Sequence, residues 1–236
     1  YGRATATYLN IARETRDPRL ARRATELALA GRSLESALPA AELWHELEPD
    51  SDMAAQTLET LLLSTGRFIP AEPLLATRLA EARTDGSLPL VYRKLQSLLT
   101  RVADKSAALD MLARLAEPDA DVPAARLAVG ALAMAADKPE RALAEARAAM
   151  ALEPDDPQPA LAAARYANQG DDSAQARQIL REFLERNPDA TDVRFMLARL
   201  LVADGDPQAA REQFEHALAR RPDDPTILFS LGQLAG

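Results

Sequence analysis

The side chains that could carry out catalysis are few and lie far apart in the sequence. The chain has two histidines, His45 and His216, and no cysteine, so it offers no thiolate nucleophile, no disulfide and no cysteine zinc site. Each histidine stands beside carboxylates, and we interpret both as surface residues of helices. The sequence has no glycine-rich phosphate loop, no HExxH motif and no GxSxG motif. We therefore expect no catalytic residues, no metal site and no cofactor.

Three acidic clusters, EPDSD at 48–52, EPDAD at 117–121 and EPDDP at 153–157, contain the carboxylates that calcium prefers. They lack the spacing of an EF-hand loop and its terminal glutamate. Asp is also a favoured helix cap, and proline is tolerated at the first position of a helix. We therefore interpret the clusters as turns between helices, in which caps begin the next helix.

Prolines in these turns reveal a repeat. Pro154, Pro188 and Pro222 follow one another at steps of 34 residues, and Pro118 and Pro49 fall near the same grid. A short turn lies midway between the prolines, so each period predicts a helix, a tight turn and a second helix. We expect glycine in this turn to be the left-handed residue that ends the first helix, and Asp to cap the second. The predicted turns are Gly31-Arg32, Gly66-Arg67, Ala103-Asp104, Ala136-Asp137, Gly170-Asp171 and Gly205-Asp206.

The hydrophobic period is helical throughout, and no segment has the pattern of a strand. Even the apolar run at 61–66 lies inside a longer helical pattern and is rich in leucine. The helices are predicted at 3–15, 18–30, 34–48, 51–65, 68–83, 87–101, 104–116, 121–135, 138–152, 157–169, 172–187, 191–204, 207–220 and 225–235.

The repeat resembles the tetratricopeptide repeat, which has small residues near positions 8, 20 and 27, a bulky residue near 24 and proline near 32. In residues 191–224 these positions hold Ala198, Ala210, Ala217, Phe214 and Pro222. The resemblance implies one all-α, right-handed superhelical solenoid of about six to seven repeats over 1–236. Its expected parts are the second helix of a preceding repeat at 1–17, degenerate repeats at 18–122, well-matched repeats at 123–224, and a truncated repeat or capping helix at 225–236.

One degenerate repeat, which we begin at Ser87, is the weakest match. It carries Lys94 where a small residue is expected, so the register of this repeat is open by a residue or more.

Charge and length narrow the class of partner. The 236 residues carry a net charge of −8 with a pI of about 5.0, which opposes attraction to nucleic acid or anionic lipid. Residues 1–32 hold seven basic and three acidic residues, or +4, which leaves −12 for the rest. Arg16, Arg19 and Arg22 could form a stripe for an acidic partner, or a solvated helix face paired with Glu14 and Glu26.

Binding is expected on the concave face, which the first helix of each repeat lines in this family. An extended peptide or a helix would suit such a groove. For any one of its apolar residues, the alternative is simple packing against adjacent helices. The groove positions taken from the resemblance are Arg19, Arg22, Glu26, Gln56, Thr60, Val91, Leu95, Leu98, Leu127, Met134, Leu161, Arg165, Asn168, Phe195 and Arg199. The family's carboxylate clamp, which uses Lys and Asn, is not matched, because Arg22 and Glu26 stand at those positions.

The first fifty residues are similar to the amino-proximal repeats of large proteobacterial tetratricopeptide lipoproteins. The matching residues are Thr15, Asp17, Pro18, Ala21, Arg23, Ala24, Thr25, Ala28, Trp44 and Pro49. This resemblance implies an outer-membrane-anchored, periplasmic adaptor that binds a C-terminal-processing protease and its clients, such as cell-wall hydrolases. The first residues have neither a signal-peptide apolar segment nor an initiator Met, so we expect any signal or lipid anchor to lie upstream.

Two alternatives stay open. One is a scaffold in envelope assembly or export, such as polysaccharide secretion or pilus biogenesis. The other is an enzyme with a groove carboxylate such as Glu26. The absence of cysteine suits the cytosol and the periplasm alike.

Overall fold

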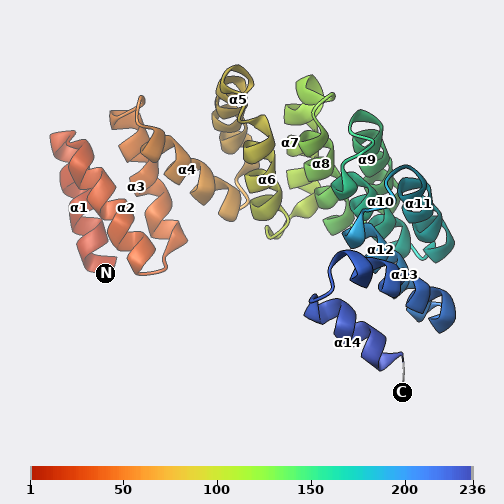
Figure 1. Cartoon of the computed structure of the whole chain (residues 1–236). Coiled ribbons are helices and arrows are strands. Elements are labelled where there is room, and N and C mark those ends of the chain that lie inside the picture. Colours follow the sequence, from red (N-terminus) through yellow and green to blue (C-terminus); the bar gives the residue numbers. More distant parts are fainter. Residues whose placement is uncertain (1, 235–236) are drawn as a thin grey trace. The chain divides into compact units, whose positions relative to one another are not determined.

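The computed structural model describes residues 2–234, and within them it contains fourteen α-helices, one 3-10 turn and no strand. Figure 1 shows the helices following one another along the chain. Their bounds are α1 (Gly2–Thr15), α2 (Pro18–Ala30), α3 (Leu34–Leu47), α4 (Asp52–Ser64), α5 (Phe68–Asp85), α6 (Leu88–Leu99), α7 (Lys105–Ala116), η1 (Glu117–Asp119), α8 (Pro123–Ala135), α9 (Pro139–Leu152), α10 (Pro157–Gln169), α11 (Ser173–Arg186), α12 (Thr191–Ala203), α13 (Pro207–Arg220) and α14 (Pro225–Gln233).

All fourteen predicted helices are present, and their observed ends differ from the predicted ends by at most two residues. The predicted end of the last helix, at 235, lies outside the described residues. The all-α prediction is therefore confirmed. Its basis is local, because a 3.6-residue apolar period and proline stop signals are written directly into the sequence.

The chain forms two compact units. Unit 1 comprises residues 1–87 and 97–115, and unit 2 comprises residues 88–96 and 116–236. In unit 1, α1, α2 and α3 pack together, and α4 packs on α3 and α5. In unit 2 each helix from α8 to α14 packs on its neighbour in the chain, and α8 and α12 both contact α10. The prediction of one uninterrupted solenoid stays a prediction.

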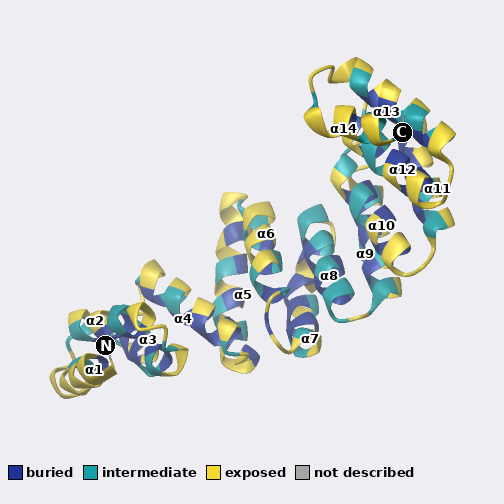
Figure 2. Cartoon of the chain, turned by 90° about the horizontal axis from the view of Figure 1, so that it is seen from below, coloured by how far each residue is buried: buried dark blue, intermediate teal, exposed yellow. Residues whose placement is uncertain are grey.

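Small side chains let the helices of a pair approach closely. Ala198, Ala210 and Ala217, at the predicted small positions, are completely buried. At Gly130 in α8 a Cβ atom would lie 3.2 Å from the carbonyl oxygen of Ala142 in α9. The expected packing positions are thus confirmed in unit 2. Figure 2 shows the resulting buried stripes, and it shows α1 and α14 as mostly exposed.

Five of the six turns predicted inside the helix pairs share one geometry. After α2, α4, α8, α10 and α12, the second residue past the helix is left-handed, and the third donates its N–H to a carbonyl five residues back, as in a Schellman motif. Gly66 and Gly205 occupy the left-handed position with φ of 72° and 79°, as predicted.

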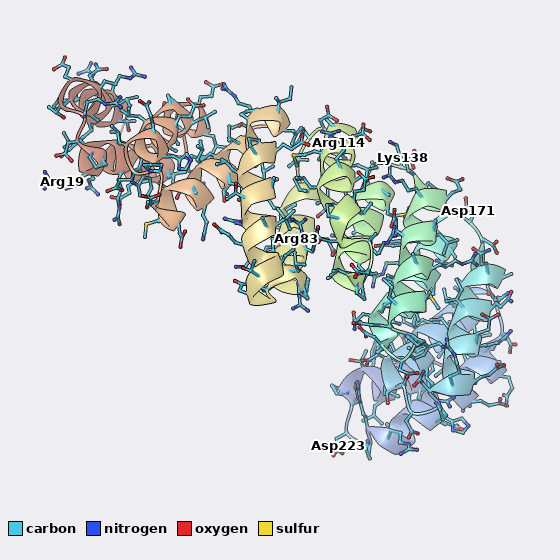
Figure 3. All side chains as sticks on the ribbon, turned by 90° about the horizontal axis from the view of Figure 1, so that it is seen from above. Arg19, Arg83, Arg114, Lys138, Asp171 and Asp223 are labelled. Carbon is cyan, nitrogen blue, oxygen red and sulfur yellow. The ribbon has the colours of Figure 1, made fainter. Side chains whose placement is uncertain are left out.

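At two turns the predicted left-handed residue is wrong by one position. Gly31 and Gly170 have φ of −80° and −87°, and the left-handed residues are Arg32 and Asp171, with φ of 54° and 63°. Figure 3 labels Asp171 at its turn. The reason is that α2 and α10 extend up to the residue before the glycine, so the turn begins with it. Asp137 is also left-handed, so it does not cap α9 as expected.

The acidic clusters form turns, as predicted, but an Asp does not cap the following helix in all of them. Asp156 Oδ1 accepts a hydrogen bond from the Gln158 N–H at 2.9 Å, whereas α4 is capped by Ser51. Asp119, in the cluster at 117–121, has a different role. It is buried, and its Oδ2 accepts a hydrogen bond from the Tyr92 hydroxyl at 2.5 Å. This Asp joins α6 to the 3-10 turn inside unit 2.

Candidate functional site

The first helices of successive repeats form a hollow of about 520 Å³ in unit 2. The ninth residue of α6, of α8 and of α10 lies in its wall, and these residues are Gln96, Ala131 and Arg165. The remaining lining residues lie one to four positions further along α8 and α10. They are Met134, Ala135, Tyr166 and Gln169. Residues from three helices therefore converge because each helix presents the same positions to the hollow.

Met134 and Arg165 were both predicted groove residues, and the structure brings them into the wall of one hollow. Gln96 was missed because the repeat was begun at Ser87, whereas α6 begins at Leu88. That shift moves every position in α6 by one residue. The signal available in the sequence was Lys94, whose charge at a small-residue position left the register of this repeat open by a residue or more.

The same shift overturns the expectation for Leu95. This residue is only 2% exposed and packs in the core, so it is not offered to a partner. Its place corresponds to the buried small-residue position of the other repeats, at the eighth residue of the helix. Val91 and Leu98, from the same misaligned repeat, are half-buried.

The chemistry of the hollow is a mixture of one cation, neutral polar groups and apolar surface. Arg165 is the single charged residue among its lining residues, and its side chain is exposed. Tyr166 is almost completely buried, and burial raises the pKa of its phenol, although the nearby Arg165 charge acts in the opposite direction. Gln96 and Gln169 supply amide groups, while Met134, Ala131 and Ala135 supply apolar contact. Such a site can bind, but it has no nucleophile paired with a base.

Other predicted groove residues lie nearby in the repeat order. Arg199 is the ninth residue of α12, the position that Arg165 holds in α10, and it is exposed. Phe195 is half-buried, and its ring meets that of Phe214 edge to face, with centroids 5.4 Å apart. The aromatic side chain therefore holds α12 against α13, so packing explains Phe195 at least in part. Leu127 and Leu161 are half-buried, and Asn168 is exposed.

The three arginines of the predicted stripe are engaged in ion pairs. Arg16 pairs with Glu46 at 2.8 Å, Arg19 with Asp17 at 2.7 Å, and Arg22 with Glu26 at 3.0 Å. All three arginine side chains are at least half exposed, and pairs of this kind stabilise a protein little. The geometry is that of a solvated helix face. Arg22 pairs with Glu26, one of the two expected partners, whereas Arg16 and Arg19 pair with Glu46 and Asp17 and not with Glu14.

Arg22 has a second contact. Its guanidinium lies 5.7 Å from the centroid of the Trp44 ring, and the Trp44 Nε1–H donates to Glu48 Oε2 at 2.7 Å. The cation–π contact connects α2 to the buried tryptophan of α3, which gives this groove candidate a role in packing.

A second hollow, of about 500 Å³, lies in unit 1 and includes the predicted residue Gln56. His45 also lines it, and the His45 Nδ1 atom is buried without a hydrogen-bond partner in the described residues. Glu59, another lining residue, is buried, and Arg78 Nη1 donates to its Oε1 at 2.7 Å. Burial raises the pKa of Glu59 to about 7 and outweighs the opposing charge of Arg78. Thr60 of α4 is exposed.

Across residues 2–234, no group of three or more His, Cys, Asp and Glu side chains is arranged to hold a metal ion. Nor is any helix in that range both long enough and apolar enough to span a bilayer.

The fold and the hollow together describe a helical-repeat protein that presents side chains from successive first helices. Comparison with known proteins narrows this class. The tetratricopeptide repeat family model matches residues 167–234, which span the end of α10 to the end of α14. No curated protein sequence matches the chain.

One solved structure extends the likeness in fold over nearly the whole chain, and two others are also similar to it. The C-terminal part of a TPR repeat-containing protein from Cytophaga hutchinsonii is 15% identical, with 98% of this chain and 94% of that chain covered and a TM-score of 0.51. A TPR protein of Thermus thermophilus is 15% identical over 93% of this chain and 99% of its own, with a TM-score of 0.48. YrrB, described as a TPR protein with an unusual peptide-binding site, is 14% identical over 96% of this chain and 98% of its own, with a TM-score of 0.45. The match to the family model and the likeness to the Cytophaga hutchinsonii structure together give the chain a tetratricopeptide-like fold.

Proposed function

We propose that this protein is a non-catalytic scaffold that binds an extended segment of a partner protein along the first helices of unit 2. The observation that carries the proposal is the hollow itself. The same helix position, the ninth, lines the hollow in α6, α8 and α10. Such a regular row of side chains is what an extended segment of a partner protein could contact residue after residue. The polar groups of the hollow are two amides, the Tyr166 hydroxyl and one guanidinium, all of which can bind a peptide through hydrogen bonds.

The partners that we propose are a periplasmic C-terminal-processing protease and a client such as a cell-wall hydrolase. This part rests on the similarity of the first fifty residues to outer-membrane tetratricopeptide lipoproteins. It implies that the full-length protein is anchored at the outer membrane by a segment outside this sequence. A scaffold in envelope assembly or export is the alternative.

Affinity capture from an envelope extract of the source organism, followed by direct binding of the purified candidate, tests the proposal. The bait is the 1–236 chain, with Met134→Glu as the groove variant. Leu152→Glu is the matched control, because it adds the same charge to a 41% exposed leucine at the end of α9.

A protease or hydrolase that binds the parent and the control, but not Met134→Glu, supports both parts of the proposal. Secretion or assembly components in its place favour the alternative. Equal binding to all three baits contradicts the use of this groove.

A further inference from the structure

The charge of the hollow in unit 2 is opposite to that of the chain. The protein carries −8, yet the lining of the hollow includes one arginine and no carboxylate. The lining therefore favours a partner of negative charge.

Arg165 and Arg199 have no acidic partner within residues 2–234, although carboxylates of unit 2 are paired with other arginines. Glu145 pairs with Arg126 at 3.0 Å and Asp192 with Arg221 at 2.9 Å, and Asp204 pairs with Arg177. Both Arg165 and Arg199 are exposed and lie at the ninth position of neighbouring first helices, and α10 contacts α12. The two guanidinium groups are therefore repeated cations with which no acidic side chain of residues 2–234 forms an ion pair.

The groups around Arg165 fit a carboxylate beside an apolar side chain. Tyr166 and Gln169 follow it in the wall and carry a hydroxyl and an amide that can donate hydrogen bonds. Met134, Ala131 and Ala135 offer apolar surface next to them. A guanidinium can bind a carboxylate with two parallel hydrogen bonds, which gives orientation as well as affinity.

We propose that the groove recognises an acidic segment of the partner protein, in which an Asp or Glu side chain binds Arg165 and a second one binds Arg199. This rests on the proposed function. Neighbouring packed helices lie about 8–10 Å apart, and an extended chain advances about 3.3 Å per residue, so the two acidic residues are expected about three positions apart. Small apolar residues of the partner, next to the acidic residue that binds Arg165, would contact Met134, Ala131 and Ala135.

The test uses random twelve-residue peptides displayed on phage, joined at their carboxyl ends so that no free C-terminal carboxylate is present. They are selected on the purified 1–236 chain, on Arg165→Glu and on Arg181→Glu. The last variant is the matched control, because Arg181 is exposed on the second helix α11 and makes no ion pair within residues 2–234. Thermal unfolding of each variant verifies the fold, and Arg165→Gln serves as a milder second variant.

The parent and the control are expected to enrich Asp or Glu pairs about three residues apart, and Arg165→Glu is expected to lose them and enrich Lys or Arg. For one enriched peptide, changing the first acidic residue to its amide should weaken binding about tenfold or more. Enriched peptides without acidic bias, or a bias that persists in Arg165→Glu, would overturn the inference while leaving peptide binding intact. Enrichment of no peptide at all would contradict the proposed function itself.

Discussion

Arg78 on α5 donates a hydrogen bond to Glu59 on α4 at 2.7 Å, and the Glu59 side chain is only 4% exposed. A buried carboxylate with one cation beside it is costly to ionise unless the pair recovers the lost hydration. Here burial dominates, so the pKa of Glu59 is raised from 4.5 to about 7.

The pH dependence of unit 1 follows from this shift. The folded chain holds the Glu59 proton more tightly than the unfolded chain, so the stabilisation is complete below the unfolded pKa near 4.5 and is lost as the pH rises through about 7. The loss is about 3 kcal/mol at most. Urea unfolding at pH 5 and pH 8, followed by fluorescence of the single tryptophan, Trp44 of unit 1, measures it.

Glu59→Gln is the comparison that isolates the carboxyl group, since Gln keeps an oxygen that can accept from Arg78 without titrating. In this variant the difference in the free energy of unfolding between pH 5 and pH 8 should shrink. An unchanged pH dependence would show that other groups cause it.

The left-handed turns differ in how well their residues suit the conformation. Asp171 has φ of 63° and Gly205 has φ of 79° in equivalent turns. Because glycine adopts positive φ without a steric cost, Asp171→Gly should stabilise the protein by about 0.5–1 kcal/mol, and Gly205→Ala should destabilise it by about 1 kcal/mol. Thermal unfolding checks both changes.

Gly170→Ala is the control for these turns, because Gly170 has φ of −87° and an added Cβ would meet its neighbours at no less than 3.4 Å. We expect a smaller effect than that of Gly205→Ala. If the two alanine variants are equally destabilised, positive φ is not the cause.

Close packing of α13 depends on a small residue at Ala210, which is completely buried. Ala210→Leu should destabilise the repeat by about 1–3 kcal/mol through overpacking. Chemical denaturation measures the change, with Ala219→Leu as the control, since Ala219 is exposed on the same helix. Equal free energies of unfolding for Ala210→Leu and the parent would refute the packing role.

Because Arg22 contacts Trp44, its substitution by alanine should affect the protein more than the substitution of an arginine that makes surface contacts alone. Arg22→Ala should lower stability by about 0.5–1 kcal/mol and change the Trp44 emission, because it removes the cation from the ring. Arg19→Ala is expected to change neither, since within residues 2–234 the Arg19 side chain pairs with Asp17 alone, at the surface. Identical spectra for Arg22→Ala and the parent would contradict the cation–π contact.

The amino-acid sequence by itself determined the helices, their turns and the small packing positions. Each depends on residues close together in the chain: a 3.6-residue apolar period, proline at helix starts, and alanine at fixed places in a 34-residue unit. For the same reason Met134 and Arg165 could be predicted as groove residues from their register alone, since that register is clear in unit 2.

Only the tertiary structure decided what depends on the exact start of a helix or on distant contacts. A one-residue difference at the start of α6 buries Leu95 and places Gln96 in the hollow, because adjacent helix positions face about 100° apart. Tyr92 and Asp119 are 27 residues apart, and Glu59 and Arg78 are 19 apart. No pattern of residues close together in the chain brings such side chains together, because their burial and pairing arise from how one helix packs against another.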